Sequence, residues 1–306
     1  MLAQRIIDTL RFFDLQNLPL TAYEIHKFLL PDKSLLKSKL DERYELDEFP
    51  PVTAPVHLDT ILTQLYILTR EQAIACLKGH YCLLGREQII QDRLRNYLYG
   101  VRREKLIRRY LKPARHIPFV RGVAIAGSQA LGQQRSTSDI DLLIITDSKY
   151  MWTARTLLSA WFHLFGVRRH GKKITNRFCL NHYLADPKEL SSERNLYTAM
   201  EYAKLRPVIY PHRIVKFQKA NKEWLKQFFP NIEFGAIPVK QTSGLQVLLE
   251  KVFTNSFGQW LEKRLGNWQR KRINQDNFVF VRPNELRFHP DSKQASLLKG
   301  YFDSAR

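Results

Sequence analysis

The chain has 306 residues, which is enough for two or three domains with substantial cores. Its 49 Lys and Arg residues against 29 Asp and Glu give a net charge of +20, which disfavours cationic ligands and favours a polyanion such as nucleic acid or an anionic surface. A basic surface that only contacts solvent is the alternative. No apolar run has the length of a membrane span, and charged residues interrupt the apolar residues at the N-terminus, so we expect a cytoplasmic protein with no membrane partner.

Residues 1–85 are predicted to form a small helical module that ends in a β-hairpin. Apolar residues recur at helical spacing in three segments, and Thr21 with Glu24 fits the capping box that begins a second helix. Lys78-Gly79 separates two short apolar runs and is typical of a tight hairpin turn. Three helices followed by a hairpin resemble a winged helix, whose third helix enters the major groove in DNA-binding versions.

The third predicted helix, residues 57–69, lacks the charge that DNA binding requires. A single basic residue, Arg70, lies at its end, and the nearby residues 41–48 are acidic and would repel phosphate. We therefore expect a structural or protein-contact role for the module, with sequence-specific DNA binding as the alternative.

Residues 86–110 are predicted to form a long helix with a basic face, which Pro113 ends. This face contains Arg93, Arg95, Arg102, Arg103, Lys105, Arg108 and Arg109. Because the helix leads directly into the next strand, its C-terminal end should lie near the site that the following two strands are expected to form. The face either binds phosphate, of a nucleotide or of a nucleic-acid strand, or is simply solvated, and the sequence favours neither interpretation.

Two strands and a polar turn follow in residues 119–146. The apolar run Val123–Ala126 predicts a buried strand that ends at Gly127-Ser128, and a second strand opens with Asp139-Ile140-Asp141. Because side chains alternate along a strand, the two carboxylates point the same way, about 7 Å apart. Such a pair needs a cation, and oxygen ligands suit Mg²⁺ or Mn²⁺. Gly127 permits close approach of a bound group, and Ser128 offers its hydroxyl and amide to phosphate. Two solvated aspartates at a strand end are the alternative.

Gly127-Ser128, followed by Ser138-Asp139-Ile140-Asp141-Leu142, resembles the signature of the nucleotidyltransferase superfamily, which includes DNA polymerase β and the minimal nucleotidyltransferases. The resemblance implies that Gly-Ser holds the triphosphate of a nucleotide and that Asp-x-Asp binds the two metal ions that drive attack on the α-phosphate. It also implies an α+β fold. We expect a polymerase-β-like domain over residues 86–235, a winged-helix-like module over 1–85, and a helical, basic C-terminal region over 236–306.

A third strand is predicted at residues 177–184, where the superfamily carries its third metal-binding carboxylate. Asn181 stands at that position. An amide oxygen can bind Mg²⁺, but without charge, and it cannot act as a general base, so the departure leaves catalysis open. Asp186 and Glu201 are candidate substitutes. His182 should face away from Asn181 and is expected to be a packed polar residue.

The remaining segments are expected to supply core. Residues 150–165 form a predicted aromatic-rich helix, and residues 245–273 a single amphipathic helix with a basic end. Trp260 and Trp268 are expected to close a helical core rather than to stack on bases. The cysteines lack metal-ligand spacing, so reduced core residues are expected at Cys76, Cys82 and Cys179. Residues 195–230 and Phe288-His289-Pro290 extend the resemblance to a group of uncharacterised bacterial nucleotidyltransferase-domain proteins.

Together these features predict a metal-dependent enzyme that moves an NMP from an NTP, with ATP as the expected donor, to an acceptor hydroxyl. Ser138 is expected to join Gly127 and Ser128 in binding the nucleotide. Its remaining charge would be neutralised by Arg135, Lys105, Arg121 or Arg177. The charge of the chain favours RNA as the acceptor, with a protein hydroxyl as the second choice. The alternatives are an inactive nucleotidyltransferase fold that binds nucleotide or nucleic acid, and a winged-helix regulator with a nucleotide-sensing domain.

Overall fold

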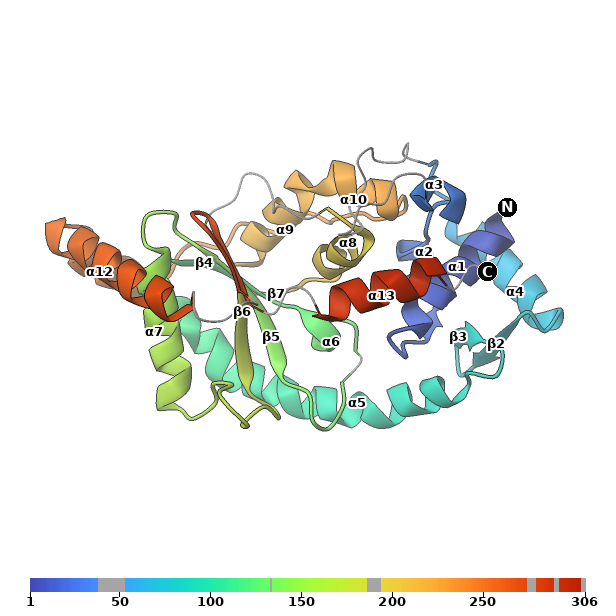
Figure 1. Cartoon of the computed structure of the whole chain (residues 1–306), viewed down its shortest axis with the longest axis horizontal. Helices are drawn as coiled ribbons and strands as arrows, with labels where there is room; N and C mark the ends of the chain where they lie inside the picture. Colours follow the sequence, from blue (N-terminus) through green and yellow to red (C-terminus); the bar gives the residue numbers. More distant parts are fainter. Residues whose placement is uncertain (38–52, 133, 186–193, 274–278, 289–291, 304–306) are drawn as a thin grey trace.

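The computed structural model describes residues 1–37, 53–132, 134–185, 194–273, 279–288 and 292–303. Its centre is a six-stranded mixed sheet in the order β7-β4-β5-β6-β9-β8 (Figure 1). The strands are β4 Val120–Ile125, β5 Ile140–Thr146, β6 Phe178–Ala185, β7 Arg206–Ile209, β8 Val279–Arg282 and β9 Glu285–Phe288. Strands β5 and β6 pair in parallel, and the other neighbours in this sheet are antiparallel.

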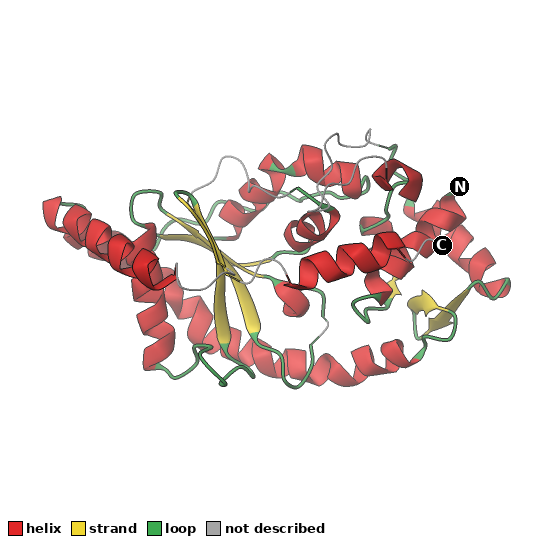
Figure 2. Ribbon diagram, viewed as in Figure 1, coloured by secondary structure: helices red, strands yellow, loops and turns green. Residues whose placement is uncertain are grey.

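Helices cover both faces of this sheet (Figure 2). One face packs against α7 Met151–Leu164 and the end of α12 Ser256–Ile273 through residues such as Ile140, Leu142 and Phe162. The other face, which includes Leu143 and Ile145, packs against helices α8 Leu196–Ala203, α9 Pro211–Ala220 and α10 Lys222–Phe228. The alternation of strand side chains that the sequence predicts therefore divides β5 between two cores.

The described part of the N-terminal region, residues 1–37 and 53–85, forms four helices and a small sheet. The elements are α1 Leu2–Asp14, β1 Leu20–Thr21, α2 Ala22–Lys27, α3 Lys33–Lys37, α4 Leu58–Arg70, β2 Ile74–Leu77 and β3 His80–Leu83. The predicted hairpin is confirmed: β2 and β3 pair antiparallel around Lys78 and Gly79, both with positive φ, as a tight hairpin turn requires. The capping box of Thr21 and Glu24 is confirmed as well. The acidic residues 41–48 lie outside the described ranges.

A hydrophobic core joins this N-terminal part to helices α8, α10 and α13 Ser292–Asp303. The rings of Phe12 and Tyr301 lie 5.3 Å apart, and those of Phe28 and Phe229 lie 5.5 Å apart. Lys33 Nζ donates to the Tyr301 carbonyl at 2.7 Å, which fixes α13 beside α1 and α3. The predicted domain boundaries at residues 85 and 235 remain predictions.

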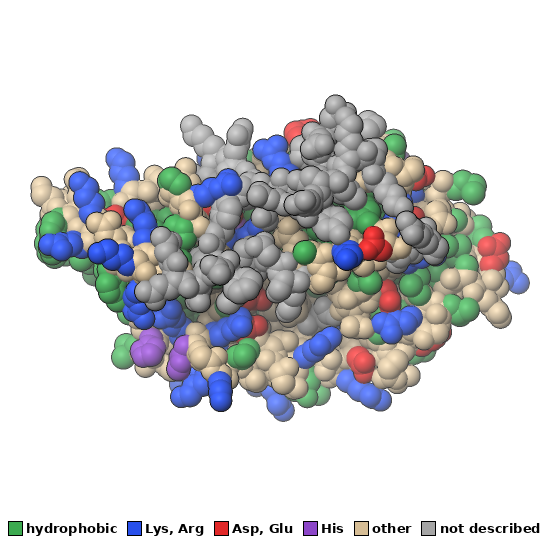
Figure 3. Space-filling model, viewed as in Figure 1, with side chains coloured by type: hydrophobic (Ala, Val, Ile, Leu, Met, Phe, Trp, Pro, Cys, Tyr) green, Lys and Arg blue, Asp and Glu red, His purple; other side chains and the backbone are tan. Residues whose placement is uncertain are grey.

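Helix α5, Gln88–Leu106, connects the N-terminal part to the central sheet and continues as a π-helix, Ile107–Leu111, and a 3₁₀-helix, Lys112–His116. It runs along the lower edge of the molecule in Figure 1, where Lys and Arg side chains are spread over the surface in Figure 3. The long helix predicted at residues 86–110 is thus present, and it leads into β4 as expected.

The C-terminal helical segment departs from the prediction of one helix over residues 245–273. It forms two helices, α11 Gly244–Phe253 and α12 Ser256–Ile273, because Asn255 Oδ1 accepts a hydrogen bond from Gly258 N at 2.9 Å and so caps a new helix. The preference for a buried role of the tryptophans is also wrong, since Trp260 and Trp268 are more than half exposed. Among the described helices, none is long and apolar enough to cross a bilayer.

Candidate active site

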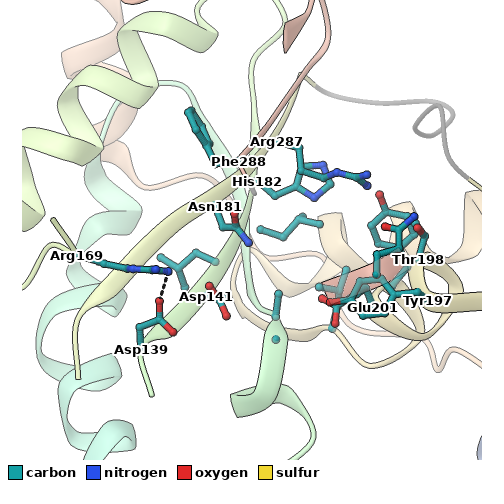
Figure 4. Close-up of a pocket in the computed structure, with 17 residues that line it drawn as sticks. Asp139, Asp141, Arg169, Asn181, His182, Tyr197, Thr198, Glu201, Arg287 and Phe288 are labelled. Carbon is teal, nitrogen blue, oxygen red and sulfur yellow. Dashed lines mark hydrogen bonds and ion pairs between the residues drawn. The ribbon is translucent and has the colours of Figure 1, made fainter. Parts of the chain in front are cut away.

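Asp139 and Asp141 lie together at the start of β5, as the sequence predicts (Figure 4). Ile140 between them points into the core on the other face of the sheet. Because β5 and β6 are parallel neighbours, Asp141 pairs with Cys179 on β6. Ligand atoms of Asp139, Asp141 and Cys179 lie within 4.8 Å of one another, so the three residues form one polar cluster.

Gly127 brings the turn after β4 against this cluster. The residue has φ +60°, and a Cβ added there would lie 2.3 Å from Asp141 Oδ2. Ala126 N donates to the Asp141 carbonyl at 2.9 Å, which fixes the two strands at this level. Gly127 therefore satisfies two requirements, a left-handed backbone and the absence of a side chain beside the carboxylate. The bend and the aspartates are neighbours, as expected.

Arg103 supports the loop that leads into the aspartates. It is fully buried on α5, and its Nη2 donates to the carbonyls of Arg135 at 2.6 Å and Ser138 at 2.9 Å. Ser138 Oγ in turn accepts from Arg135 N at 3.1 Å. A charged donor that holds several carbonyls stabilises one loop conformation and so positions Asp139.

Arg169 is a site residue that the sequence did not single out. Its Nη1 binds Asp139 Oδ2 at 2.6 Å and lies 3.4 Å from Cys179 Sγ. The basic loop at residues 168–173 was visible in the sequence, but nothing there indicates which of its side chains turns back over the sheet. Arg169 partly neutralises the acidic pair.

The electrostatics of the cluster favour a bound cation. Burial raises the pKa of Asp141 to about 7, and the neighbouring carboxylates of Asp139 and Glu201 add to this shift, while Arg169 opposes it. Burial also raises the pKa of the Cys179 thiol to about 12. An ionised Asp141 is thus costly in this environment unless further positive charge is supplied.

A β-bulge changes the predicted geometry of the third strand. The register between β5 and β6 shifts between Asp141 and Leu143, so that His182 and Asn181 both line the site instead of facing opposite ways. Within the described residues, the buried Asn181 Oδ1 has no hydrogen-bond partner. His182 Nε2 is bonded to Glu285 Oε1 at 2.9 Å on the neighbouring strand β9. The bulge therefore delivers an unused acceptor to the site.

Two cavities meet at the aspartates. A cavity of about 340 Å³ extends past Asn181 toward Tyr202 and Phe288. A second, of about 620 Å³, extends along the Gly127 turn and the loop before β5. Both are lined by Gly127, Asp139, Asp141, Arg169, Tyr197 and Glu201.

The predicted nucleotide-binding residues divide between these cavities and the outer surface. Ser128, Arg135 and Ser138 line the larger cavity. Lys105 is exposed on α5 and lines neither cavity. Of the two candidate substitute carboxylates, Glu201 lines both cavities, and Asp186 lies outside the described residues.

Two of the expected cations have other partners. Arg121 is paired with Glu250 and Asp147. Arg177 donates to the Gly166 carbonyl.

The comparison with protein families agrees with this geometry. Residues 105–225 match the family model described as the nucleotidyltransferase domain. The chain carries a nucleotidyltransferase domain. The matched segment begins within α5 and ends within α10, so it contains the Gly-Ser turn, both aspartates and the third strand. No curated protein and no solved structure matches the chain significantly. The family match confirms the predicted nucleotidyltransferase domain, and the mixed sheet with its covering helices confirms the α+β class.

Proposed function

We propose that this nucleotidyltransferase domain moves an NMP from an NTP, with ATP as the expected donor, to a hydroxyl of RNA. The observation that carries the proposal is the contact of Gly127 with Asp141, which brings the Gly-Ser turn and the Asp-x-Asp pair to one place. Transfer of a phosphoryl group depends mostly on positioning and charge stabilisation, and both cavities open at that place.

The residues present fit a divalent cation. Asp139 and Asp141 offer carboxylate oxygens, and the unpartnered Asn181 Oδ1 offers a neutral one in the same cavity. When bound, Mg²⁺ or Mn²⁺ would stabilise negative charge on the phosphates and orient the attacking and leaving oxygens. Burial and the neighbouring carboxylates raise the pKa of Asp141, and a bound cation would offset the cost of its charge.

We place the phosphates and the nucleoside according to the side chains that line each cavity. Ser128, Arg135 and Lys204 line the larger cavity and would hold the β- and γ-phosphates. The smaller cavity has aromatic residues, among them Tyr202 and Phe288, and would hold the nucleoside. Arg169 would exchange its contact with Asp139 for a phosphate oxygen.

The chemical step follows from this placement. The acceptor oxygen attacks the α-phosphorus, the bond from that phosphorus to the bridging oxygen of the β-phosphate breaks, and pyrophosphate leaves. The hydroxyl proton must pass to a base, and Asn181 cannot accept it. Among the described residues, Glu201 is the further carboxylate that lines both cavities, and it is ion-paired with Lys204. We assign the proton to Glu201, which must then exchange this contact as Lys204 turns to the phosphates.

The N-terminal part is best interpreted as a winged-helix-like module that contacts protein. The pairing of β1 with β3, beside the β2–β3 hairpin, supports this interpretation. Exposed apolar residues such as Leu62 and Tyr66 on α4, together with Arg70 as its single basic residue, favour a protein partner over DNA.

The test is label transfer. Each α-³²P-labelled NTP is incubated with total RNA and Mg²⁺ or Mn²⁺, and the γ-labelled NTP serves as a control because its label must leave with pyrophosphate. Transfer from the α position that ribonuclease removes, and that the Asp139→Asn/Asp141→Asn variant lacks, is the expected result. Label that only protease removes would identify a protein acceptor instead.

An inactive nucleotide-binding fold is the second candidate, and two observations favour it. Asn181 stands where a third carboxylate is expected, and Arg169 already pairs with Asp139. Calorimetric binding of an NTP by the wild type without label transfer under any metal condition would establish this second function.

A further inference from the structure

A line of exposed basic residues follows the outer face of α5 and the two turns after it. This basic track consists of Arg95, Arg102, Lys105, Arg108, Arg109, Lys112 and Arg115. Glu104 is the one acidic residue between residues 95 and 116, and it is paired with Arg206. Among the described residues, no carboxylate forms a salt bridge with any member of the track.

The opposite face of the same helix holds the track in one orientation. Arg103, Ile107, Leu111 and Ala114 are buried against the sheet domain, so the exposed face cannot rotate. Members of the track recur about once per helical turn, a rise of roughly 5.4 Å. Regularly spaced charges on a rigid element suit a partner whose own charges are regularly spaced, and the exposed ring of Tyr97 on α5 offers a surface on which a base can stack.

The track ends in a cavity that is separate from the candidate active site. This cavity, of about 460 Å³, lies at the end of the edge strand β7. Lys112 and Arg115 of the track line it together with Lys240, and none of its lining residues is acidic. Helices α9 and α11 both begin at its wall, at Pro211 and Gly244, so the positive ends of their helix dipoles lie there.

Tyr210, which lines this cavity, is held in a strained backbone conformation by hydrogen bonds. Tyr210 has left-handed backbone angles, φ 45° and ψ 63°, which are costly for a residue with a side chain. Its hydroxyl donates to Gln246 Oε1 at 2.6 Å and accepts from Ser243 N at 2.9 Å. Gln246 is fully buried, and its Nε2 donates to the carbonyls of Ile117 and of Val120, the first residue of β4. The surroundings therefore hold an unfavourable conformation at the place where the basic side chains converge.

We propose that the basic track and the cavity beside β7 bind successive phosphate groups of a nucleic-acid strand. A concave basic pocket at the end of a line of charges fits a chain of phosphates better than a planar lipid surface, which cannot enter the cavity. The inference rests on the proposed function only in one respect, that the bound strand is the acceptor of the NMP. Binding itself is independent of catalysis.

The test is fluorescence anisotropy of labelled single-stranded RNA across a salt series. A track variant, Arg102→Glu/Lys105→Glu/Arg109→Glu, is compared with Lys219→Glu/Lys263→Glu/Lys299→Glu, which changes the net charge equally at exposed residues elsewhere. A cavity variant, Lys112→Glu/Lys240→Glu, is compared with Lys219→Glu/Lys299→Glu. Circular dichroism melts establish that all four variants fold.

The track variant should weaken binding by about tenfold or more and lower the slope of log K against log salt by about 2, as the loss of three phosphate contacts predicts. The cavity variant should weaken it by roughly fivefold. Each control should change it by less than about threefold, through net charge alone. Equal losses in track variant and control would overturn the proposal. The proposal would also be overturned if the track variant, but not its control, lost binding to phosphatidylserine vesicles while its RNA binding stayed unchanged.

Two further arms separate this inference from the proposed function. The Asp139→Asn/Asp141→Asn variant should bind RNA as the wild type does, and retained binding in a wild type without transfer would refute the proposed function alone. If the track variant transferred the NMP to RNA with an unchanged KM for RNA, the proposed role of the basic track would be refuted and the proposed function would stand. DNA of the same sequence shows whether the sugar is recognised in addition to phosphate.

Discussion

Gly127 and Asp141 lie in direct contact, so closely that a methyl group on the glycine would approach the carboxylate oxygen to 2.3 Å. The contact couples the turn that is expected to hold phosphate to the carboxylate that is expected to hold metal. A change in either residue therefore displaces the other, and the two proposed roles can be tested through one position.

Replacement of Gly127 by Ala should abolish transfer and lower the stability. A left-handed backbone costs an alanine about 1–2 kcal/mol, and the new Cβ must also push Asp141 aside. Gly166→Ala is the matched control, since Gly166 has φ +63° and open space around its Cα. The control should lose stability by a similar backbone term in thermal melts and keep its activity. Equal activity in the two variants would separate the turn from the site.

The raised pKa of Asp141 predicts a pH-dependent stability. A carboxyl group whose folded pKa is about 7, above its unfolded value of 3.8, contributes stability that is complete below the unfolded pKa and is lost as the pH rises through 7. Asp141→Asn should therefore stabilise the metal-free protein by on the order of 2 kcal/mol more at about pH 8 than at about pH 5. The measurement is denaturant unfolding at both pH values, with the exposed Asp59→Asn as the control. A pH-independent effect would show that burial does not penalise the Asp141 charge.

The sequence predicts the centre of the site better than its rim. Gly127, Asp139 and Asp141 follow from local patterns, because strand alternation and the glycine turn are encoded by neighbouring residues. Arg169 is 30 residues away from Asp139 in the sequence but binds it in the fold. Glu201 lies on α8, which lines another side of the same cavity. Such contacts depend on tertiary packing, which no local spacing reveals.

Two departures have equally specific causes. The bulge opposite Leu142 turns Asn181 and His182 toward one cavity, and strict alternation cannot foresee an inserted residue. Lys105 shares the basic helix with Arg103, yet the fold buries Arg103 and exposes Lys105. The sequence predicts a basic helix beside the site, but which of its faces is buried depends on the elements that pack against it.

Removal of Arg169 should strengthen metal binding while it weakens nucleotide binding. The guanidinium competes with a cation for Asp139, so Arg169→Ala should lower the Kd for Mn²⁺ by roughly threefold to tenfold. Because Arg169 also lines both cavities, the KM for the NTP should rise. Electron paramagnetic resonance reports free Mn²⁺, and steady-state kinetics give KM. Lys172→Ala, an exposed change in the same loop, is the control and should alter neither value.

Parallel losses of metal and nucleotide affinity in Arg169→Ala would contradict this competition. They would indicate that Arg169 only supports the fold of the loop, and Arg169→Lys, which keeps the charge, would then fail to restore either affinity.

Cys179 should set the metal preference of the site. Its Sγ lies with the two carboxylates inside the same 4.8 Å cluster, and sulfur favours softer ions over Mg²⁺. Cys179→Asp should therefore shift the preference toward Mg²⁺, and Cys179→Ser should weaken the softer ions without adding a charge. Calorimetric titration with Mg²⁺, Mn²⁺ and Cd²⁺ measures these preferences without turnover. Cys82→Ser, at another buried cysteine, is the control for lost packing. If the wild type and both Cys179 variants rank the three ions alike, the thiol does not contact the metal, and the two aspartates with Asn181 must bind it unaided.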